Sequence, residues 1–150
     1  AEVLQAHVDE GLKFARKNRL PKPIAAFIPE HQGTLKMGYF LNKAQEKKLN
    51  INDNDFRYKG PIPQSKETAI LMLADGCEAA LRAMDINASD FEAQETISKI
   101  VSSRKVDGQL DDSNLSKGEI FLVKKSFLNV WKRIRHRRIQ YPTTKNNTFS

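Results

Sequence analysis

The segment ETAILMLADGCEAALRAM, residues 67–84, predicts a helix that is apolar around most of its circumference. Asp75 lies in its middle, and the residues three and four positions before it, Leu71 and Met72, are apolar. We therefore expect the helix to be buried on both faces and Asp75 to point inward. Asp and Gly are poor residues for a helix interior, so the pair Asp75-Gly76 lowers local stability, which is typical of a functional site.

Two roles are open for this buried carboxylate. An ionised carboxylate without a partner is costly to bury, so it is normally paired, hydrogen-bonded or bound to a metal. Asp75 could cap a neighbouring helix or pair with an arginine such as Arg82, or it could bind a metal. The helix pattern alone favours the structural role by roughly two to one, because structural ion pairs also bury carboxylates.

Length and composition fit one domain, with 150 residues of which 39% are hydrophobic. No apolar run reaches the ~18 residues of a membrane span, and the acidic start is unlike a signal peptide. A single cysteine, Cys77, excludes an intrachain disulfide and fits the reducing cytoplasm. The net charge of +7 indicates an anionic partner but does not choose among nucleotides, nucleic acid and acidic lipid.

The hydrophobic periodicity and capping patterns predict an all-α helical bundle. Besides the helix that carries Asp75, we expect helices at residues 1–18, from 24 to about 31, at about 35–48, after the capping box Ser89/Glu92, and at 116–139. Residues 50–65 contain Gly60, Pro61 and Pro63 and predict a long Pro-rich loop, which we interpret as a solvated basic loop rather than a functional one. Residues 142–150 are expected to form a flexible tail.

Two histidines fall on the expected inner faces of their helices. His7 lies four residues after Val3, and His31 lies four residues after Phe27. A lone inward histidine is most often a core residue bonded to a carbonyl group. Two of them together with Asp75, on three separate helices, shift the interpretation towards a metal site.

The end of the last helix is strongly basic. Arg135 lies four residues beyond Trp131, and Arg138 lies four beyond Ile134, so we expect at least one arginine to point where the apolar stripe points. A guanidinium group in that position suits a phosphate oxygen. The rest of the basic cluster is interpreted as a solvated helix face, and specific nucleic-acid recognition is not expected.

Several motifs together resemble one branch of the HD-superfamily metal-dependent phosphohydrolases. They are AHVDEGLKFA at 6–15, PEHQGT at 29–34, DFRYKGPIPQSKETAILMLADGCEAA at 55–80, DGQLDDSNL at 107–115 and HRRIQYP at 136–142. The branch is the cytoplasmic HD domain of seven-transmembrane bacterial proteins that hydrolyse cyclic di-AMP. The resemblance implies two divalent metals, iron or manganese, held by histidines and aspartates. His7, His31 and Asp75 then resemble metal ligands, and the residues that would neutralise substrate phosphate are Arg138, His136, Lys66 and Arg57.

Two departures from the family pattern change the expected activity. Gln32 stands where the family has the second of two paired histidines, and an amide oxygen is a much weaker ligand. The family's upstream histidine and its His-Asp pair have no counterpart, since the chain has only three histidines. We therefore expect residues 1–141 to form a partial HD domain with reduced or absent metal occupancy and little turnover. Attachment to an upstream membrane region would place it at the inner face of a membrane.

Three functions remain open from the sequence. The first is a phosphodiesterase that acts on a cyclic dinucleotide or another phosphate ester. The second is a non-catalytic HD-like module that binds a nucleotide or a partner, which Gln32 would fit. The third is a basic helical domain that binds RNA or a membrane surface, which rests only on the C-terminal charge.

Overall fold

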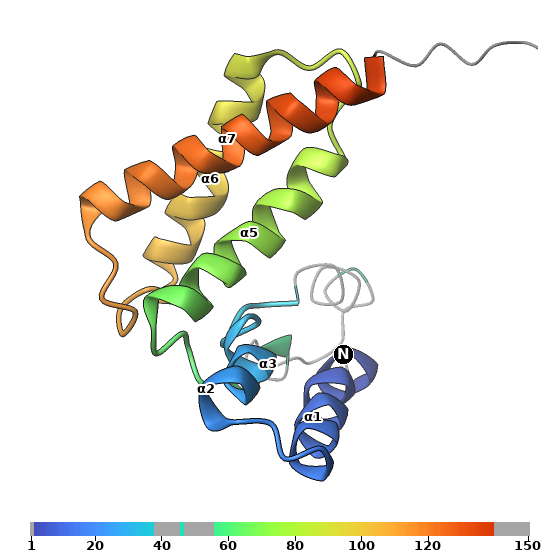
Figure 1. Cartoon of the computed structure of the whole chain (residues 1–150), viewed down its shortest axis with the longest axis vertical. Coiled ribbons are helices and arrows are strands. Elements are labelled where there is room, and N and C mark those ends of the chain that lie inside the picture. The colour runs from blue at the N-terminus through green and yellow to red at the C-terminus, as the bar shows by residue number, and fades with distance from the viewer. Residues whose placement is uncertain (1, 38–45, 47–55, 140–150) are drawn as a thin grey trace, which may run out of the picture.

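A computed structural model describes residues 2–37, 46 and 56–139, with side chains for 6–37, 46 and 56–136. Apart from one isolated bridge, these residues are helical or irregular, so the predicted all-α class is confirmed (Figure 1). The elements are α1 (Glu2–Lys17), α2 (Lys22–Ala25), α3 (Phe27–Glu30), α5 (Lys66–Arg82), α6 (Asp90–Val106) and α7 (Lys117–Ile139). None of the described helices is both long and apolar enough to cross a bilayer.

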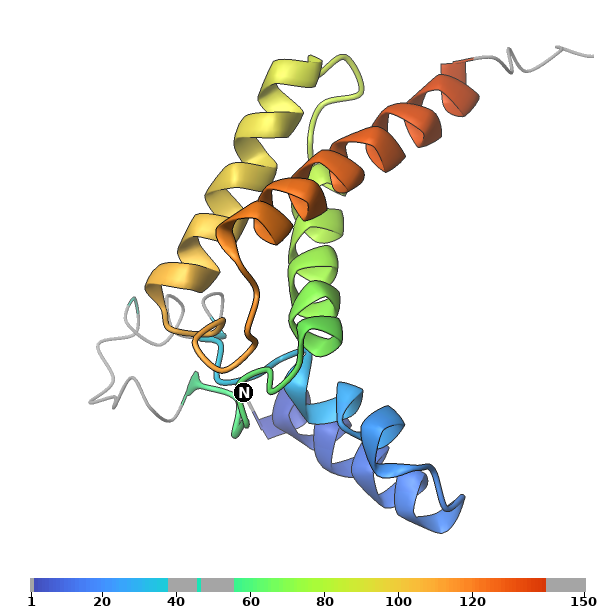
Figure 2. The same cartoon turned by 60° about the vertical axis from the view of Figure 1, so that its left-hand side comes forward.

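The helices fall into two groups that meet at the N-terminal end of α5. Helices α5, α6 and α7 pack on one another, and α3 lies beside the start of α5, with α1 and α2 packed on α3 (Figures 1 and 2). Helix α3 contacts both α1 and α5 and so joins the two groups. The core of the larger group consists of Ala69, Leu73, Cys77, Ile97, Val101 and Leu110.

Serine caps begin the three long helices of the larger group. Ser65 Oγ accepts a hydrogen bond from the Thr68 amide at the start of α5. Ser89 and Glu92 form a capping box at α6, and Ser116 and Glu119 bond reciprocally at α7. Both predicted capping boxes are therefore confirmed, and each satisfies backbone donors that have no partner within the helix.

The predicted helix at 35–48 is wrong at its start. Lys36 forms an antiparallel bridge with Arg57, the Met37 amide donates to the Phe56 carbonyl at 2.7 Å, and the Tyr58 amide donates to the Leu35 carbonyl at 3.1 Å. This pairing satisfies the backbone in an extended form. The rest of the predicted helix, and the start of the predicted Pro-rich loop, lie largely outside the described residues.

Helix α5 is buried on one face rather than on both. Met72 and Leu73 are buried, but Leu71 is 39% exposed and Asp75 is exposed. The inward orientation expected for Asp75 is therefore wrong, because the buried face of α5 is formed by other positions, namely Thr68, Ala69, Met72, Leu73 and Cys77. Its expected structural partner, Arg82, pairs instead with Glu78.

Gly76 is explained by packing against α6. A Cβ atom at this position would lie 3.1 Å from an Arg104 guanidinium nitrogen and 3.2 Å from Ile100 Cγ2. The glycine thus lets the arginine side chain cross close to the backbone of α5. The helix accepts a poor helix former here because a Cβ atom would require the Arg104 and Ile100 side chains to shift.

The apolar stripe of α7 stops short of the predicted one. Phe127 and Trp131 are half-buried, but Ile134 is 50% exposed. On the neighbouring helix α6, the Phe91 side chain is also exposed, at 71%. The next position after Ile134 is filled by an inward arginine, as expected. Arg135 lies over the Trp131 ring, 5.0 Å from its centroid, and donates to the Ala88 carbonyl, so its partners are a ring and a backbone oxygen.

Candidate functional site

Two of the predicted metal ligands lie side by side where α1 meets α3. The His7 and His31 rings are in an edge-to-face arrangement, with centroids 6.0 Å apart. Gly11 allows this approach, because a Cβ atom there would lie 2.8 Å from Ile28 Cγ2. His31 is half-buried, whereas His7 is exposed, so the expectation that His7 faces the core is wrong.

Hydrogen bonds to the backbone fix the orientation of the His31 ring. Nδ1 lies 2.7 Å from the Ile28 carbonyl oxygen and 3.0 Å from the Phe27 carbonyl oxygen. A carbonyl oxygen only accepts, so Nδ1 carries the proton and Nε2 keeps a lone pair. Nε2 lies 3.1 Å from the Gln32 amide nitrogen, which donates to it. This hydrogen-bonding arrangement is found both in core histidines bonded to carbonyl groups and in histidines oriented to ligate a metal through Nε2.

Tyr58 is a further member of this group that the predicted site residues did not include. Its ring lies edge-to-face against His7, with centroids 5.9 Å apart. Burial raises the pKa of the Tyr58 hydroxyl, and the charge of Asp75 raises it further. The Tyr58 ring therefore contacts the His7 ring, and the negative charge of Asp75 on α5 acts on the Tyr58 hydroxyl. In the sequence, Tyr58 offers a hydroxyl within the loop at 50–65, which we interpret as solvated, and it belongs to the motif at 55–80.

Asp75 is close to this group electrostatically but open to solvent. Among the described residues it has no hydrogen bond or ion pair, and its charge acts on the pKa of Tyr58 and of Arg104. Over residues 6–37, 46 and 56–136, no three His, Cys, Asp or Glu side chains lie close enough together to hold a metal. The assignment of His7, His31 and Asp75 as ligands therefore stays a prediction.

A polar network, in which Gln109 is fully buried and Asp107 is exposed, holds the turn that follows His31. Arg57 donates to both carboxylate oxygens of Asp107, at 3.0 and 3.2 Å, and to the Thr34 carbonyl at 2.7 Å. The fully buried Gln109 accepts from the Thr34 amide at 3.0 Å and donates to Thr34 Oγ1 at 2.8 Å and to Asp107 Oδ2 at 3.0 Å. The Arg57 hydrogen bond also lowers the pKa of the Asp107 carboxyl. The turn is thus tied to the segment between α6 and α7.

A second buried connection joins α3 to α5. Glu30, which is only 6% exposed, accepts hydrogen bonds through Oε2 from Thr68 Oγ1 at 2.6 Å and from the Gln64 amide at 2.9 Å. This carboxylate was not singled out in the sequence, since no local pattern marks it. It sets the position of His31, the next residue, relative to the helix that carries Asp75.

Of the four residues predicted to neutralise substrate phosphate, three have described side chains, and these three lie on different parts of the fold. Arg57 is engaged by Asp107, and Lys66 pairs with Glu119 at 2.6 Å, which lowers the pKa of the Glu119 carboxyl to about 2. His136 is exposed near the C-terminal end of α7, which lies far from α1 in both views (Figures 1 and 2). The side chain of Arg138 lies outside the described residues.

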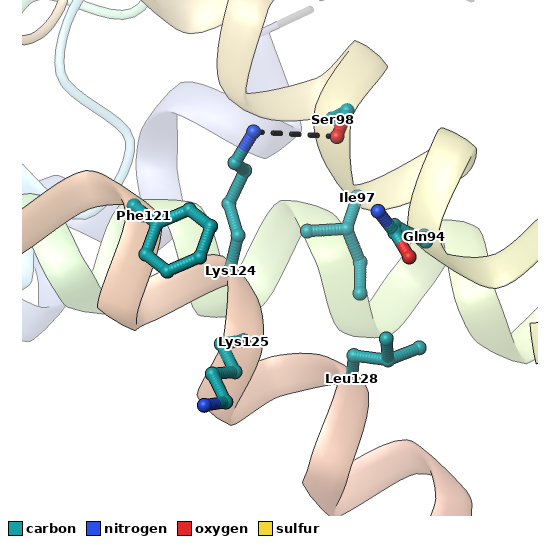
Figure 3. A pocket seen from close by; sticks show the side chains of 7 residues that line it. All are labelled: Gln94, Ile97, Ser98, Phe121, Lys124, Lys125 and Leu128. Carbon is teal, nitrogen blue, oxygen red and sulfur yellow. Dashed lines mark hydrogen bonds between the residues drawn. The ribbon is translucent and has the colours of Figure 1, made fainter. Parts of the chain in front are cut away.

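A separate cavity lies between α6 and α7, and it contains none of the predicted site residues (Figure 3). Its lining is mostly apolar, and Lys124 donates to Ser98 Oγ across it at 3.4 Å. The residues that line it are Gln94, Ile97, Ser98, Phe121, Lys124, Lys125 and Leu128. It lacks the imidazole and carboxylate groups that mark the region around His31.

Comparisons with known proteins agree with the motifs. No protein-family model matches the chain. An uncharacterized protein of Synechocystis is 42% identical over 146 residues, and the cyclic-di-AMP phosphodiesterases PgpH of Bacillus subtilis and Listeria monocytogenes are 35% and 32% identical over 140 and 145 residues. The match covers 93–97% of this chain but only 18–20% of these relatives.

Solved structures give the same result. The crystal structure of the L. monocytogenes PgpH HD domain in complex with cyclic di-AMP superposes with a TM-score of 0.84 at 30% identity. The alignment covers 89% of this chain and 62% of that HD domain. A second crystal structure of the L. monocytogenes PgpH HD domain gives a TM-score of 0.82.

Proposed function

Because the chain is homologous to part of the HD domain of the cyclic-di-AMP phosphodiesterase PgpH, we propose that it carries part of a metal-dependent phosphodiesterase site. Its substrate would be a cyclic dinucleotide of the cyclic di-AMP type. His7, His31 and Asp75 would be ligands for a divalent metal, iron or manganese. The observation that carries the proposal is the pairing of His7 with His31, whose Nδ1 is engaged so that Nε2 presents a lone pair.

The donor set fits such a metal in kind. Imidazole nitrogens and a carboxylate suit borderline divalent cations, and a bound metal lowers the pKa of its water and stabilises charge on a phosphodiester. Nε2 of His31 now accepts from the Gln32 amide, so the Gln32 side chain would have to turn away before Nε2 could ligate. For this reason we expect reduced occupancy and little turnover.

The substrate phosphate needs positive or donating groups as well. Arg57 and Lys66 are candidates, but each would have to leave its carboxylate partner, Asp107 or Glu119, in order to bind the phosphate. Arg138 and His136 are further candidates near the end of α7. We also propose a cytoplasmic location, which the single buried free cysteine, Cys77, supports. Attachment at the inner face of a membrane belongs to the same proposal.

Manganese binding measured by titration calorimetry tests the metal site. We expect less than one tightly bound Mn²⁺ per chain, a loss of affinity of about tenfold or more in His31→Ala, and a gain in Gln32→His, which adds an imidazole beside His31. His136→Ala is the matched control, because it removes the histidine at the far end of α7. Equal affinities in His31→Ala and His136→Ala would overturn the site, and two tight Mn²⁺ per chain would contradict the role given to Gln32.

A non-catalytic nucleotide-binding module is the second candidate. Gln32 in a ligand position and the exposure of both His7 and Asp75 favour it. It predicts that the Mn²⁺-loaded chain binds cyclic di-AMP but releases no linear dinucleotide, and Gln32→His does not change this. The basic surface-binding alternative is less well supported, because Lys132 pairs with Asp90 and Arg135 is used within the fold.

A further inference from the structure

We propose that Tyr58 is a substrate-contacting residue of this site, and that its phenolic hydroxyl donates a hydrogen bond to a non-bridging oxygen of the bound phosphodiester. The inference rests on the proposed function, since it concerns the same group of side chains. It assigns a substrate contact to a residue outside the predicted ligands and outside the predicted phosphate-neutralising residues.

The position of Tyr58 is the first support. Its ring lies 5.9 Å from that of His7, which in turn lies 6.0 Å from that of His31. The negative charge of the Asp75 carboxylate on α5 also acts on the Tyr58 hydroxyl and raises its pKa. Tyr58 thus lies against one member of the histidine pair, beside the side chains proposed as metal ligands.

The backbone that carries Tyr58 is firmly placed. The Tyr58 amide donates to the Leu35 carbonyl, directly beside the bridge between Lys36 and Arg57. Arg57 is held in turn by a two-pronged contact with Asp107 and by its bond to the Thr34 carbonyl. A side chain on such a support loses little further freedom when it binds a ligand, which favours a binding role.

The hydroxyl has the right chemistry and no competing partner. Tyr58 is half-buried, and among the described residues no hydrogen bond to its hydroxyl oxygen is found. A phenol stays protonated near neutral pH and is therefore a donor, and phosphate oxygens are strong acceptors. The neighbouring cation, Lys59, is exposed and points to Asp9 instead, with an N–O distance of 2.8 Å.

Tyr58→Phe is the direct test, because it removes the hydroxyl and keeps the ring against His7. Titration calorimetry of the Mn²⁺-loaded chain with cyclic di-AMP should show an affinity about tenfold lower than wild type, the usual loss for one hydrogen bond to a charged acceptor. Binding of Mn²⁺ alone and the melting temperature should stay unchanged. In the control variant Lys59→Gln, which loses the ion pair with Asp9, cyclic di-AMP affinity should stay near the wild-type value.

Each contrary result has its own meaning. Wild-type affinity for cyclic di-AMP in Tyr58→Phe would overturn the inference and leave the proposed function intact. A parallel loss of Mn²⁺ affinity would also overturn it, because Tyr58 would then act on the metal ligands. An equal loss in Lys59→Gln would show that the segment, and not the hydroxyl, matters. A wild-type chain that binds neither Mn²⁺ nor cyclic di-AMP would overturn the proposed function itself, and the role of Tyr58 with it.

Discussion

Gly33, two residues after His31, is placed where both the backbone conformation and the close packing disfavour a side chain. Its φ is +52°, and a Cβ atom there would lie 2.5 Å from Gln109 Oε1 and 2.6 Å from Met72 Cε. Gly33→Ala should therefore lower the free energy of unfolding by about 2–4 kcal/mol, from left-handed backbone strain and from overpacking together. Urea denaturation measures this change.

Gly118 is the matched control for that substitution. It lies in the first turn of α7, and a Cβ atom there would meet only Ser116 Oγ, at 3.9 Å. Gly118→Ala should be neutral or slightly stabilising, because alanine is the better helix former. Equal unfolding free energies for the two variants would contradict the tight packing described around Gly33.

At the scale of single residues, the sequence identified which side chains share a face but not which faces are covered. Helical spacing selected His7, His31 and Asp75, and the two histidines do lie together. The predicted burial of His7 and Asp75 was wrong, because the spacing of residues within one helix does not show whether another element packs against that face. Glu30 was missed because its importance comes from contacts with residues distant in sequence. Tyr58 lies in the loop that was interpreted as solvated, so it was not assigned to the site.

At the scale of elements, α3 is joined to α5 mainly through the buried Glu30 carboxylate. Glu30→Ala would leave the Thr68 hydroxyl and the Gln64 amide without their acceptor, so we expect the unfolding free energy to fall by about 1–3 kcal/mol. Glu30→Gln keeps one acceptor oxygen and should lose less. Thermal or urea unfolding distinguishes the two.

A surface glutamate provides the comparison for this connection. Glu78 forms an exposed pair with Arg82 one turn along α5, and such pairs contribute only about 0.3–0.5 kcal/mol. If Glu30→Ala cost no more than Glu78→Ala, the connection between α3 and α5 would have to be carried by other contacts.

Element boundaries followed from the sequence where the signals are local. The serine caps of α6 and α7 predicted their starts, because a capping box involves residues only three positions apart. Residues 35–37 were assigned to a helix although they pair with residues 56–58. That pairing joins segments about twenty residues apart, and helical periodicity does not reveal it.

At the scale of the whole molecule, the candidate site lies at the junction of the two helix groups. Helix α1 supplies His7, α3 leads into His31, and α5 supplies Asp75, while the network of Arg57, Asp107 and Gln109 braces the segments between them. The chain spans 62% of the PgpH HD domain that it resembles in structure. Because no three candidate ligand side chains of the described residues lie close enough together to hold a metal, metal binding would have to draw the exposed side chains of His7 and Asp75 towards His31.

Paramagnetic broadening by Mn²⁺ in two-dimensional NMR spectra tests the central claim most directly, because the effect depends steeply on distance from the metal. At a small fraction of one Mn²⁺ per chain, the signals of His7, His31 and Asp75 should broaden together, while those around His136 stay sharp. Broadening confined to the exposed Asp111 and Asp112, or broadening that touches only one of the three proposed ligands, would contradict a shared metal site.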